Sequence, residues 1–377
     1  MPTGADACPG ILTLHPARDG HVARIRLPGG YVTGLQWAAL AALACEFGDG
    51  CVDLTARGNI QLRGLPQAAA GELASRAAQA GLLPSGSHDR SRNITASPLS
   101  GLGGRPPLRR LVRALDAALV ADPVLAALPG RFLCAVDDGT GGASLAASDI
   151  GLRRAGRQAE MVVAGRAAEV RLPVTAAVPA VLTAARVAVT AGVGSLVRRI
   201  RDLADGGASV AAAAGGSLGP QVSAPEGRLP LGTPGGDVLV VAAPLGRLTG
   251  PQLALTGSLL RPGEMLRLAA AGRLVIPLAV APATALARLV GSGLLTSDDD
   301  DLAGVTACSG MACSQAVADV RALARPLPGH PRTHWAACPR RCGKPPDAEA
   351  VIATGPGSFL VSGQSAGRPL ALFAELS

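Results

Sequence analysis

The segment Val52–Leu65 reads VDLTARGNIQLRGL, and apolar or small residues alternate with polar ones along it. Such sustained alternation is typical of a β-strand that buries one face. The other face carries Arg57 and Arg63 among neutral hydrogen-bonding side chains, in a chain whose single lysine is Lys344. A solvated face could use any polar residues, so the choice of arginine needs an explanation from the rest of the chain.

The composition indicates a sizeable core and a basic surface. The chain has 377 residues, enough for two or three domains, and its 48% hydrophobic content includes only 2% aromatic residues, so Ala, Leu and Val must form the core. A net charge of +8 favours a polyanionic partner, such as nucleic acid, an anionic surface or a ligand with several carboxylates. Basic runs are absent and aromatic residues are scarce, which argues against nucleic acid.

The N-terminal and apolar segments predict a cytoplasmic protein. The first ten residues, MPTGADACPG, lack the basic and apolar regions of a signal peptide. The most apolar stretch, residues 274–290, is interrupted by Pro277, Pro282 and Arg288, so we expect no membrane span. In the cytoplasm the eight cysteines are expected to be thiols or metal ligands rather than disulfides.

Two parts of the chain resemble each other. The segment GGYVTGLQWAALAAL (29–43) corresponds to LGRLTGPQLALTGSL (245–259). Both contain T-G-x-Q, which predicts a capping box at a helix start, formed by Thr33 with Gln36 and by Thr249 with Gln252. The similarity continues from AGLLPS (80–85) to SGLLTS (292–297) and from NITAS (93–97) to GVTAC (304–308). We interpret this pattern as a duplication.

The second copy keeps the apolar face of the opening segment but loses its polar face. In MLRLAAAGRLVIPL (265–278), alanine, valine and proline replace Arg57, Gln61 and Arg63. Each copy predicts a strand, a helix, a strand and a second helix (71–80 and 284–291), and the copies are expected to pair into one pseudo-symmetric sheet. Between them we expect a helix over 107–121, a strand over 131–136, a helix over 177–204 and a Gly-rich linker over 206–236.

Four cysteines form two close pairs late in the chain. Cys308 and Cys313 are spaced C-x4-C, and Cys338 and Cys342 are spaced C-x3-C. Four thiolates in two pairs can bind an iron–sulfur cluster, and they can also bind zinc, although zinc usually takes C-x2-4-C pairs. The other cysteines are scattered and are interpreted as small buried residues: Cys8, Cys45, Cys51 and Cys134.

The chain resembles the sulfite/nitrite reductase superfamily in four ordered motifs: TARGNIQLRGL (55–65), SRNITASPLSG (91–101), TACSGMAC (306–313) and CPRRCGKP (338–345). The resemblance implies an α+β fold, in which duplicated ferredoxin-like half-domains form a pseudo-symmetric domain beside two α/β domains that bind a tetrapyrrole and a [4Fe–4S] cluster. It divides the chain into a first half-domain (1–90), a tetrapyrrole-binding domain ending in the linker (91–236), a second half-domain (237–298) and a cluster domain (299–377).

The resemblance also implies roles for single residues. The cysteines that match the cluster ligands are Cys308, Cys313, Cys338 and Cys342, of which the last also bridges to sirohaem iron in the reductases. Arg57 and Arg92 match arginines of the tetrapyrrole and anion cavity and are the expected catalytic residues. The expected tetrapyrrole-binding residues, with arginine forks that bind carboxylates bidentately, are Arg57, Asn59, Gln61, Arg63, Arg92, Asn93, Thr95 and Arg131.

Two departures from the reductases narrow the expected reaction. The first cysteine pair is one residue shorter than the usual C-x5-C, and the segment LPGRFLCAVDDG (128–139) has Arg131 and Leu133 where the reductases carry active-site lysines. Because those lysines help to supply protons for six-electron reduction, their loss favours a compact monooxygenase branch with similar CPG (8–10) and RLPGG (26–30) segments. That branch uses O2 and cluster-delivered electrons to hydroxylate a polycarboxylate tetrapyrrole, which is its substrate rather than its cofactor.

The sequence leaves several alternatives open. A sirohaem-dependent nitrite or sulfite reductase, an iron–sulfur electron-transfer protein and a zinc-stabilised nucleic-acid binder are the rivals. A separate non-haem iron is a further cofactor candidate, with His334 as a candidate ligand, although packing is the favoured role for this histidine. The expected partners are the tetrapyrrole, O2 and an electron donor, either reduced pyridine nucleotide or ferredoxin, directly or through a reductase; no nucleic acid or membrane is expected.

Overall fold

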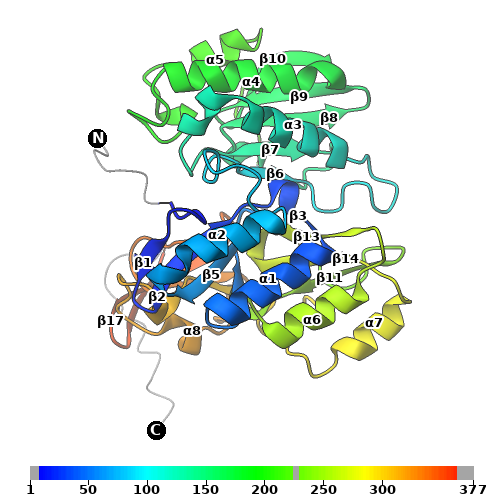
Figure 1. The fold of residues 1–377 in the computed structure, drawn as a ribbon, viewed down its shortest axis with the longest axis vertical. Helices are drawn as coiled ribbons and strands as arrows, with labels where there is room; N and C mark the ends of the chain where they lie inside the picture. Colours follow the sequence, from blue (N-terminus) through cyan, green and yellow to red (C-terminus); the bar gives the residue numbers. More distant parts are fainter. Residues whose placement is uncertain (1–7, 224–228, 363–377) are drawn as a thin grey trace.

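The computed structural model describes residues 8–223 and 229–362. Within these ranges the chain is an α+β protein whose strands form four sheets. Figure 1 shows one sheet and its helices at the top, the two related halves below, and the C-terminal sheet beside the first half. Residues 224–228 of the expected linker and 363–377 of the expected cluster domain lie outside the described residues, as does most of the N-terminal segment used to predict the compartment.

The segment 52–65 folds as a β-hairpin. Strands β4 (Cys51–Leu54) and β5 (Ile60–Leu65) are antiparallel, with Val52 opposite Leu62 and Leu54 opposite Ile60. Between them the Thr55 N–H donates to the Asn59 carbonyl at 2.9 Å, and Gly58 takes a φ of +67°. The expectation of one continuous strand is therefore wrong, because the alternating pattern runs on through a turn that carries Arg57.

The two copies exchange one strand each. The first sheet has the order β1 (His15–Ala17), β2 (Gly20–Ile25), β5, β4 and then β12 (Arg247–Thr249) from the second copy. The second sheet has the order β11 (Val238–Ala242), β14 (Arg273–Pro277), β13 (Met265–Ala269) and then β3 (Tyr31–Thr33) from the first copy. The copies thus form two sheets linked by exchanged strands, not the single sheet that we expected.

Each copy adds two helices, as predicted. These are α1 (Gly34–Phe47) and α2 (Ala70–Gln79) in the first copy, and α6 (Gly250–Leu259) and α7 (Pro282–Leu289) in the second. Both capping boxes are confirmed. The side-chain oxygens of Gln36 and Gln252 accept the backbone N–H of Thr33 and Thr249 at 3.1 and 2.9 Å.

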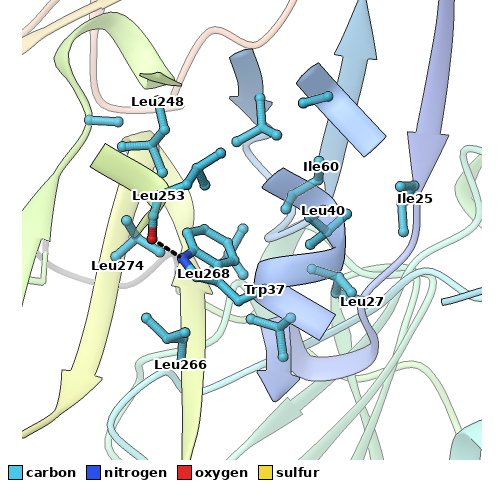
Figure 2. Close-up of a cluster of buried hydrophobic side chains, with 14 of the residues drawn as sticks. Ile25, Leu27, Trp37, Leu40, Ile60, Leu248, Leu253, Leu266, Leu268 and Leu274 are labelled. Carbon is cyan, nitrogen blue, oxygen red and sulfur yellow. Dashed lines mark hydrogen bonds between the residues drawn. The ribbon is translucent and has the colours of Figure 1, made fainter. Parts of the chain in front are cut away.

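A single hydrophobic core serves both copies. Trp37 of α1 is 1% exposed, and its Nε1–H donates to the Leu253 carbonyl of α6 at 3.0 Å and to Thr256 Oγ1 at 3.1 Å. Figure 2 shows the indole between side chains of both copies, among them Leu40 and Leu268. Each half therefore depends on the other for burial of its apolar face.

The remaining two sheets also resemble each other. The first has the order β10 (Arg166–Pro173), β9 (Gln158–Val163), β8 (Ile150–Ala155), β7 (Cys134–Asp137) and β6 (Ile94–Ala96). The second has the order β15 (Val305–Ala307), β16 (Thr333–Ala336), β17 (Glu349–Gly355) and β18 (Ser358–Val361), with α8 (Val320–Leu323) beside it. In chain order, both begin with two parallel pairs, which are followed by two antiparallel pairs in the first sheet and by one in the second.

The middle of the chain corrects three expected boundaries. The expected helix over 177–204 is α4 (Val174–Thr190), and the chain then turns through Gly192 and Gly194, each with a φ of +105°. The strand expected over 131–136 begins only at Cys134, since the Phe132 N–H closes a turn onto the Pro129 carbonyl. The linker expected over 206–236 contains α5 (Ala208–Ala213), and the helix expected over 107–121 is α3 (Arg109–Ala121).

Short 3₁₀ segments complete the described elements: Pro28–Gly30, Gln67–Ala69, Pro123–Ala127, Leu145–Ala147, Ile200–Asp202, Pro244–Gly246, Ala270–Gly272 and Gly310–Ala312. Within the described residues, none of the helices has the length and apolar character needed to cross a bilayer.

The shared core predicts that damage at Trp37 unfolds both halves together. We expect Trp37→Ala to cost about 3–5 kcal/mol, because it opens a cavity and removes two hydrogen bonds. Chemical unfolding followed by far-UV circular dichroism would measure this loss. Leu35→Ala is the matched control, because Leu35 lies on the same helix and is 87% exposed. Equal effects of the two changes would contradict a shared core at this position.

Candidate functional site

A cavity of about 880 Å³ lies where the first hairpin meets loops of the two other sheets. It lies toward the upper end of the usual range for ligand sites, roughly 300–1,000 Å³. The hairpin contributes residues 53–57, Gln61 and Arg63, and the upper sheet contributes residues 130–131 and 197–199. The turns at 245–246 and 271–272 of the second copy also reach it, so both copies form one wall.

The cavity lining is strongly cationic. Its two carboxylates are those of Asp53 and Asp202, and lysine is absent among the described lining residues. Nine arginines line it: Arg24, Arg57, Arg63, Arg131, Arg198, Arg199, Arg321, Arg340 and Arg341. Guanidinium groups bind carboxylates and phosphates bidentately, so this wall is suited to a ligand with several negative charges.

Arg57 lies at the turn of the hairpin and lines the cavity as expected. Its Nη1 donates to the Arg131 carbonyl at 3.2 Å, and it forms no ion pair with any described residue. Burial, together with the nearby charges of Arg199 and Arg24, lowers the pKa of Arg57 to about 10. A bound anion would relieve this repulsion, so the position is suited to anion binding.

Arg63 lines the cavity, but its hydrogen bonds go to the protein. Its Nε and Nη2 donate to the two carboxylate oxygens of Asp19, each at 3.0 Å. Nη1 donates to Ser309 Oγ at 3.3 Å and Nη2 to the Ala312 carbonyl at 2.9 Å. We expected a ligand clamp here, but Arg63 instead joins the first half-domain to the loop between Cys308 and Cys313.

Asn59, Asn93 and Thr95 do not line the cavity. Asn59 accepts the Leu27 N–H at 2.9 Å and donates to Asn93 Oδ1 at 3.2 Å, and Asn93 in turn donates to the Gly130 carbonyl at 2.8 Å. Thr95 donates to the Cys134 carbonyl. The structure thus places the two asparagines as a buried chain that holds the turn before Arg131, rather than as ligand contacts.

Arg92 is also placed away from the cavity. Its Nε and Nη2 donate to both carboxylate oxygens of Asp116 on α3, at 2.8 and 2.7 Å. The residue is 5% exposed. This paired and buried guanidinium does not reach the cavity, which corrects the expectation of a catalytic Arg92. Of the expected tetrapyrrole-binding set, the structure brings together Arg57, Gln61, Arg63 and Arg131.

The four cysteines of the two pairs all line the cavity. Cys308 and Cys338 follow β15 and β16, which are adjacent and parallel, so their C-terminal ends meet at one edge of the sheet. Burial raises the pKa of Cys342, and the thiolates of Cys338, Cys308 and Cys313 raise it further by repulsion. Cys342 therefore lies near the other three cysteines.

The donor set fits a cluster better than a single ion. Among the described residues, no three His, Cys, Asp or Glu side chains converge tightly enough to hold one metal ion. Zinc would draw its sulfur ligands within about 2.3 Å of one atom, which requires such convergence. A [4Fe–4S] cluster binds each cysteine through a different iron atom, so its ligands stand farther apart. Cys308 Sγ also accepts the N–H of Ala337 at 3.2 Å.

His334 lies beneath the cysteine loops rather than in the cavity. It is fully buried, and its Nδ1 lies 3.0 Å from Thr306 Oγ1. It is not among the cavity-lining residues. This placement agrees with the packing role favoured from the sequence.

The first copy has serine where the second has the first cluster cysteine. Ser97 follows β6 as Cys308 follows β15, and its Oγ accepts the Asp138 N–H at 3.1 Å, as Cys308 Sγ accepts that of Ala337. The carboxylate of Asp137 fills the adjacent turn and accepts the N–H groups of Gly139, Gly141 and Ala143. The equivalent loop of the first copy is thus closed by its own hydrogen bonds.

Sequence reasoning missed several lining residues. Arg340 and Arg341 lie between Cys338 and Cys342 in the sequence, so their position near the predicted cluster site could have been inferred. Arg198 and Arg199 follow the unexpected end of α4, outside every motif, and only the tertiary structure brings them to the cavity. Arg199 is held by the buried carboxylate of Asp149, with Nε–Oδ2 at 2.7 Å.

Residues 15–80 match the family described as nitrite/sulfite reductase ferredoxin-like half domain. This part of the chain, which carries the hairpin with Arg57, is therefore similar to such a half-domain. The fold of the whole chain is similar to that of the Mycobacterium tuberculosis NirA protein, with a TM-score of 0.70 and 18% identity over 93% of this chain and 77% of that chain. The expected fold class is confirmed.

The chain also resembles two kinds of enzyme at the sequence level. A ferredoxin–nitrite reductase of Synechococcus elongatus is 36% identical over 127 residues, which are 31% of this chain and 25% of that protein. A precorrin-3B synthase of Sinorhizobium sp is 33% identical over 120 residues, which are 30% of this chain and 25% of that protein. The matched regions span about a quarter of the length of each relative.

The hydrogen bonds of Arg63 predict a stabilising role. We expect Arg63→Gln to cost about 3 kcal/mol, because it breaks a largely buried ion pair and releases the loop before Cys313. Unfolding in denaturant would give the stability, and hydrogen exchange at residues 309–312 would report the loop. Arg76→Gln is the matched control, since its pair with Glu46 is exposed and should contribute below about 1 kcal/mol. Unchanged exchange in the Arg63 variant would contradict the anchoring role.

Proposed function

We propose that this chain is a precorrin-3B synthase-like monooxygenase of aerobic cobalamin biosynthesis. The proposed reaction uses O2 and electrons delivered through a [4Fe–4S] cluster to hydroxylate precorrin-3A at C20, with formation of a γ-lactone from the ring-A acetate. The observation that carries the proposal is the cavity itself, which combines nine arginines with the four cysteines of the two late pairs and has no lysine among its described lining residues.

The arginine wall supports a polycarboxylate macrocycle as the ligand. A precorrin carries carboxylates around the rim of a flat ring, and one guanidinium can bind each carboxylate through two parallel hydrogen bonds. Arg57 and Arg131 approach from adjacent turns, since one donates to the carbonyl of the other. Arg340 and Arg341 approach from the loop between Cys338 and Cys342, so the cationic residues come from different sides of the cavity.

The cysteine loops support an iron–sulfur cofactor beside that ligand. When bound, the cluster would supply electrons one at a time from a donor such as ferredoxin or a reduced pyridine nucleotide acting through a reductase. Cys308, Cys313, Cys338 and Cys342 would hold it, and the backbone N–H groups of Gly310 and Ala337 donate to Cys308 Sγ at 3.5 and 3.2 Å.

A sirohaem-dependent nitrite or sulfite reductase is the second candidate. The identity with ferredoxin–nitrite reductase, 36% over 127 residues, favours it. In that case sirohaem would occupy the cavity, and the arginines would bind the carboxylates of sirohaem instead of those of the precorrin. A non-catalytic electron-transfer protein is less well supported, because it would have no use for a cavity of about 880 Å³.

The cofactor content separates these candidates. We expect the protein purified without oxygen to contain about four iron atoms and four sulfides, with a broad visible absorbance that dithionite bleaches and no haem bands. Cys308→Ser should lose iron and sulfide, and Cys45→Ser, a change in an exposed cysteine on α1, should retain both. Sirohaem bands would support the reductase instead, and zinc without sulfide would contradict both.

The arginine wall can be tested by binding alone. We expect Arg57→Gln to weaken binding of precorrin-3A about 10- to 100-fold, because a charge-assisted hydrogen bond contributes about 1.5–3 kcal/mol. Quenching of intrinsic fluorescence would give the Kd without turnover. Arg157→Gln, an exposed arginine at the tip of the β8–β9 hairpin, is the matched control. Equal affinity of the Arg57 variant and the wild type would argue against carboxylate binding at this turn.

A further inference from the structure

Asp53 is the one sequestered carboxylate among the described residues that line the cavity. The other lining carboxylate, Asp202, and the lining imidazole, His15, are both exposed. The Asp53 side chain is only 13% exposed. It lies on β4, directly opposite Gln61 of β5 on one side and Arg247 of β12 on the other. The exchanged strand β12 thus completes its surroundings.

The carboxylate of Asp53 forms two ion pairs but lacks a hydrogen bond at Oδ1. Arg63 Nε lies 4.0 Å away, and its hydrogen bonds are made to Asp19, Ser309 and Ala312. Arg247 Nε lies 3.3 Å from Asp53 Oδ1 without a hydrogen bond between them, and the same guanidinium also pairs with Asp49. A buried carboxylate oxygen that accepts no hydrogen bond is less well stabilised in its ionised form.

Charged groups reach Asp53 from every neighbouring element. They are Arg63 on β5, Arg247 on β12, Arg321 on α8, Cys51 at the start of β4 and Asp49 just before it. Burial raises the pKa of Asp53, and this outweighs the opposing effect of the three arginines. The balance is the reverse of the usual result for a carboxylate surrounded by arginines, because two of those guanidinium groups are committed to other acids.

The proposed reaction consumes protons. Hydroxylation by O2 follows the balance RH + O2 + 2e⁻ + 2H⁺ → ROH + H2O, with the electrons from a ferredoxin or pyridine-nucleotide reductant. The nine lining arginines cannot release protons at physiological pH, and Lys344 donates to the carbonyls of Pro345 and Pro346 in its own loop. We propose that Asp53 is the proton donor of the cavity, passing its proton to the oxygen that leaves as water and being reprotonated from solvent.

This inference rests on the proposed function for its substrate, but reduction of nitrite or sulfite also consumes protons at the same cavity. We expect Asp53→Asn to lower turnover of precorrin-3A about 100-fold, in the range for loss of a general acid, with the Kd changed less than about twofold. Wild-type turnover should fall as pH rises through the pKa of Asp53, because the protonated form is the donor. Asp53→Asn should no longer show this fall in rate with rising pH, and Asp53→Glu should show it again.

Asp237→Asn is the matched control, since the carboxylate of Asp237 is exposed and lies outside the cavity lining. It should keep both rate and pH profile. An Asp53→Asn protein with the wild-type rate and pH profile would overturn the proposal. A second result would also overturn it: Asp53→Asn loses substrate affinity and thermal stability together with its rate, and Asp53→Glu recovers all three but not the fall in rate with rising pH. That result would indicate a packing role for Asp53.

An infrared measurement separates this inference from the identity of the substrate. We expect the wild type to show a carboxylic-acid C=O band that titrates well above the usual range for aspartate and is missing from Asp53→Asn. If the wild type does not turn over precorrin-3A but shows this band, the proposed substrate is wrong and the protonated Asp53 is supported. Absence of the band would overturn the proposal whatever the activity.

Discussion

The exchange of β3 and β12 between the two copies is the constraint on which the rest of this structure depends. Because β12 pairs with β4 and β3 pairs with β13, neither half can complete its sheet alone. The same exchange packs α1 against α6 and places Trp37 in a core supplied by both copies. It also brings the hairpin turn with Arg57 and the equivalent turn at Ala271 to one cavity wall. A duplicated fold thereby gains a site at its pseudo-symmetric junction.

The two copies have diverged in complementary ways. The first copy keeps a polar hairpin, with Arg57 at the turn, and closes the loop after β6 with Ser97 and Asp137. The second copy has an apolar hairpin, with Ala271 at the matching turn, and opens the loop after β15 to present Cys308. The hairpin turn thus carries a charged residue only in the first copy, and the loop presents a cysteine to the cavity only in the second. The arginine of the first copy and the cysteines of the second line the same cavity. The single cavity results from this division.

The sequence patterns correctly predicted those features that depend on interactions between residues close in sequence. The T-G-x-Q segments predicted both capping boxes, and the cysteine spacing placed four thiols in one wall, because caps and short loops depend on neighbouring residues. The turn at Gly58 was missed because polar and apolar residues continue to alternate through it, although Gly-Asn is a turn signal. Arg63 and Arg92 were assigned to ligand binding because their partners, Asp19 and Asp116, are distant in sequence. Arg199 was missed for a similar reason, because its position depends on Asp149, which is 50 residues away in sequence.

Because arginine rather than lysine lines the cavity, anion binding and proton transfer must be carried out by different groups. A guanidinium stays charged and binds an anion with fixed geometry, so nine of them make a durable binding wall but no proton source. A carboxylate within such a wall would ordinarily be ionised by its neighbours. We propose that this is prevented at Asp53, because Arg63 also pairs with Asp19 and Arg247 also pairs with Asp49. The strand exchange supplies Arg247, whose guanidinium lies between Asp49 and Asp53 of the first copy.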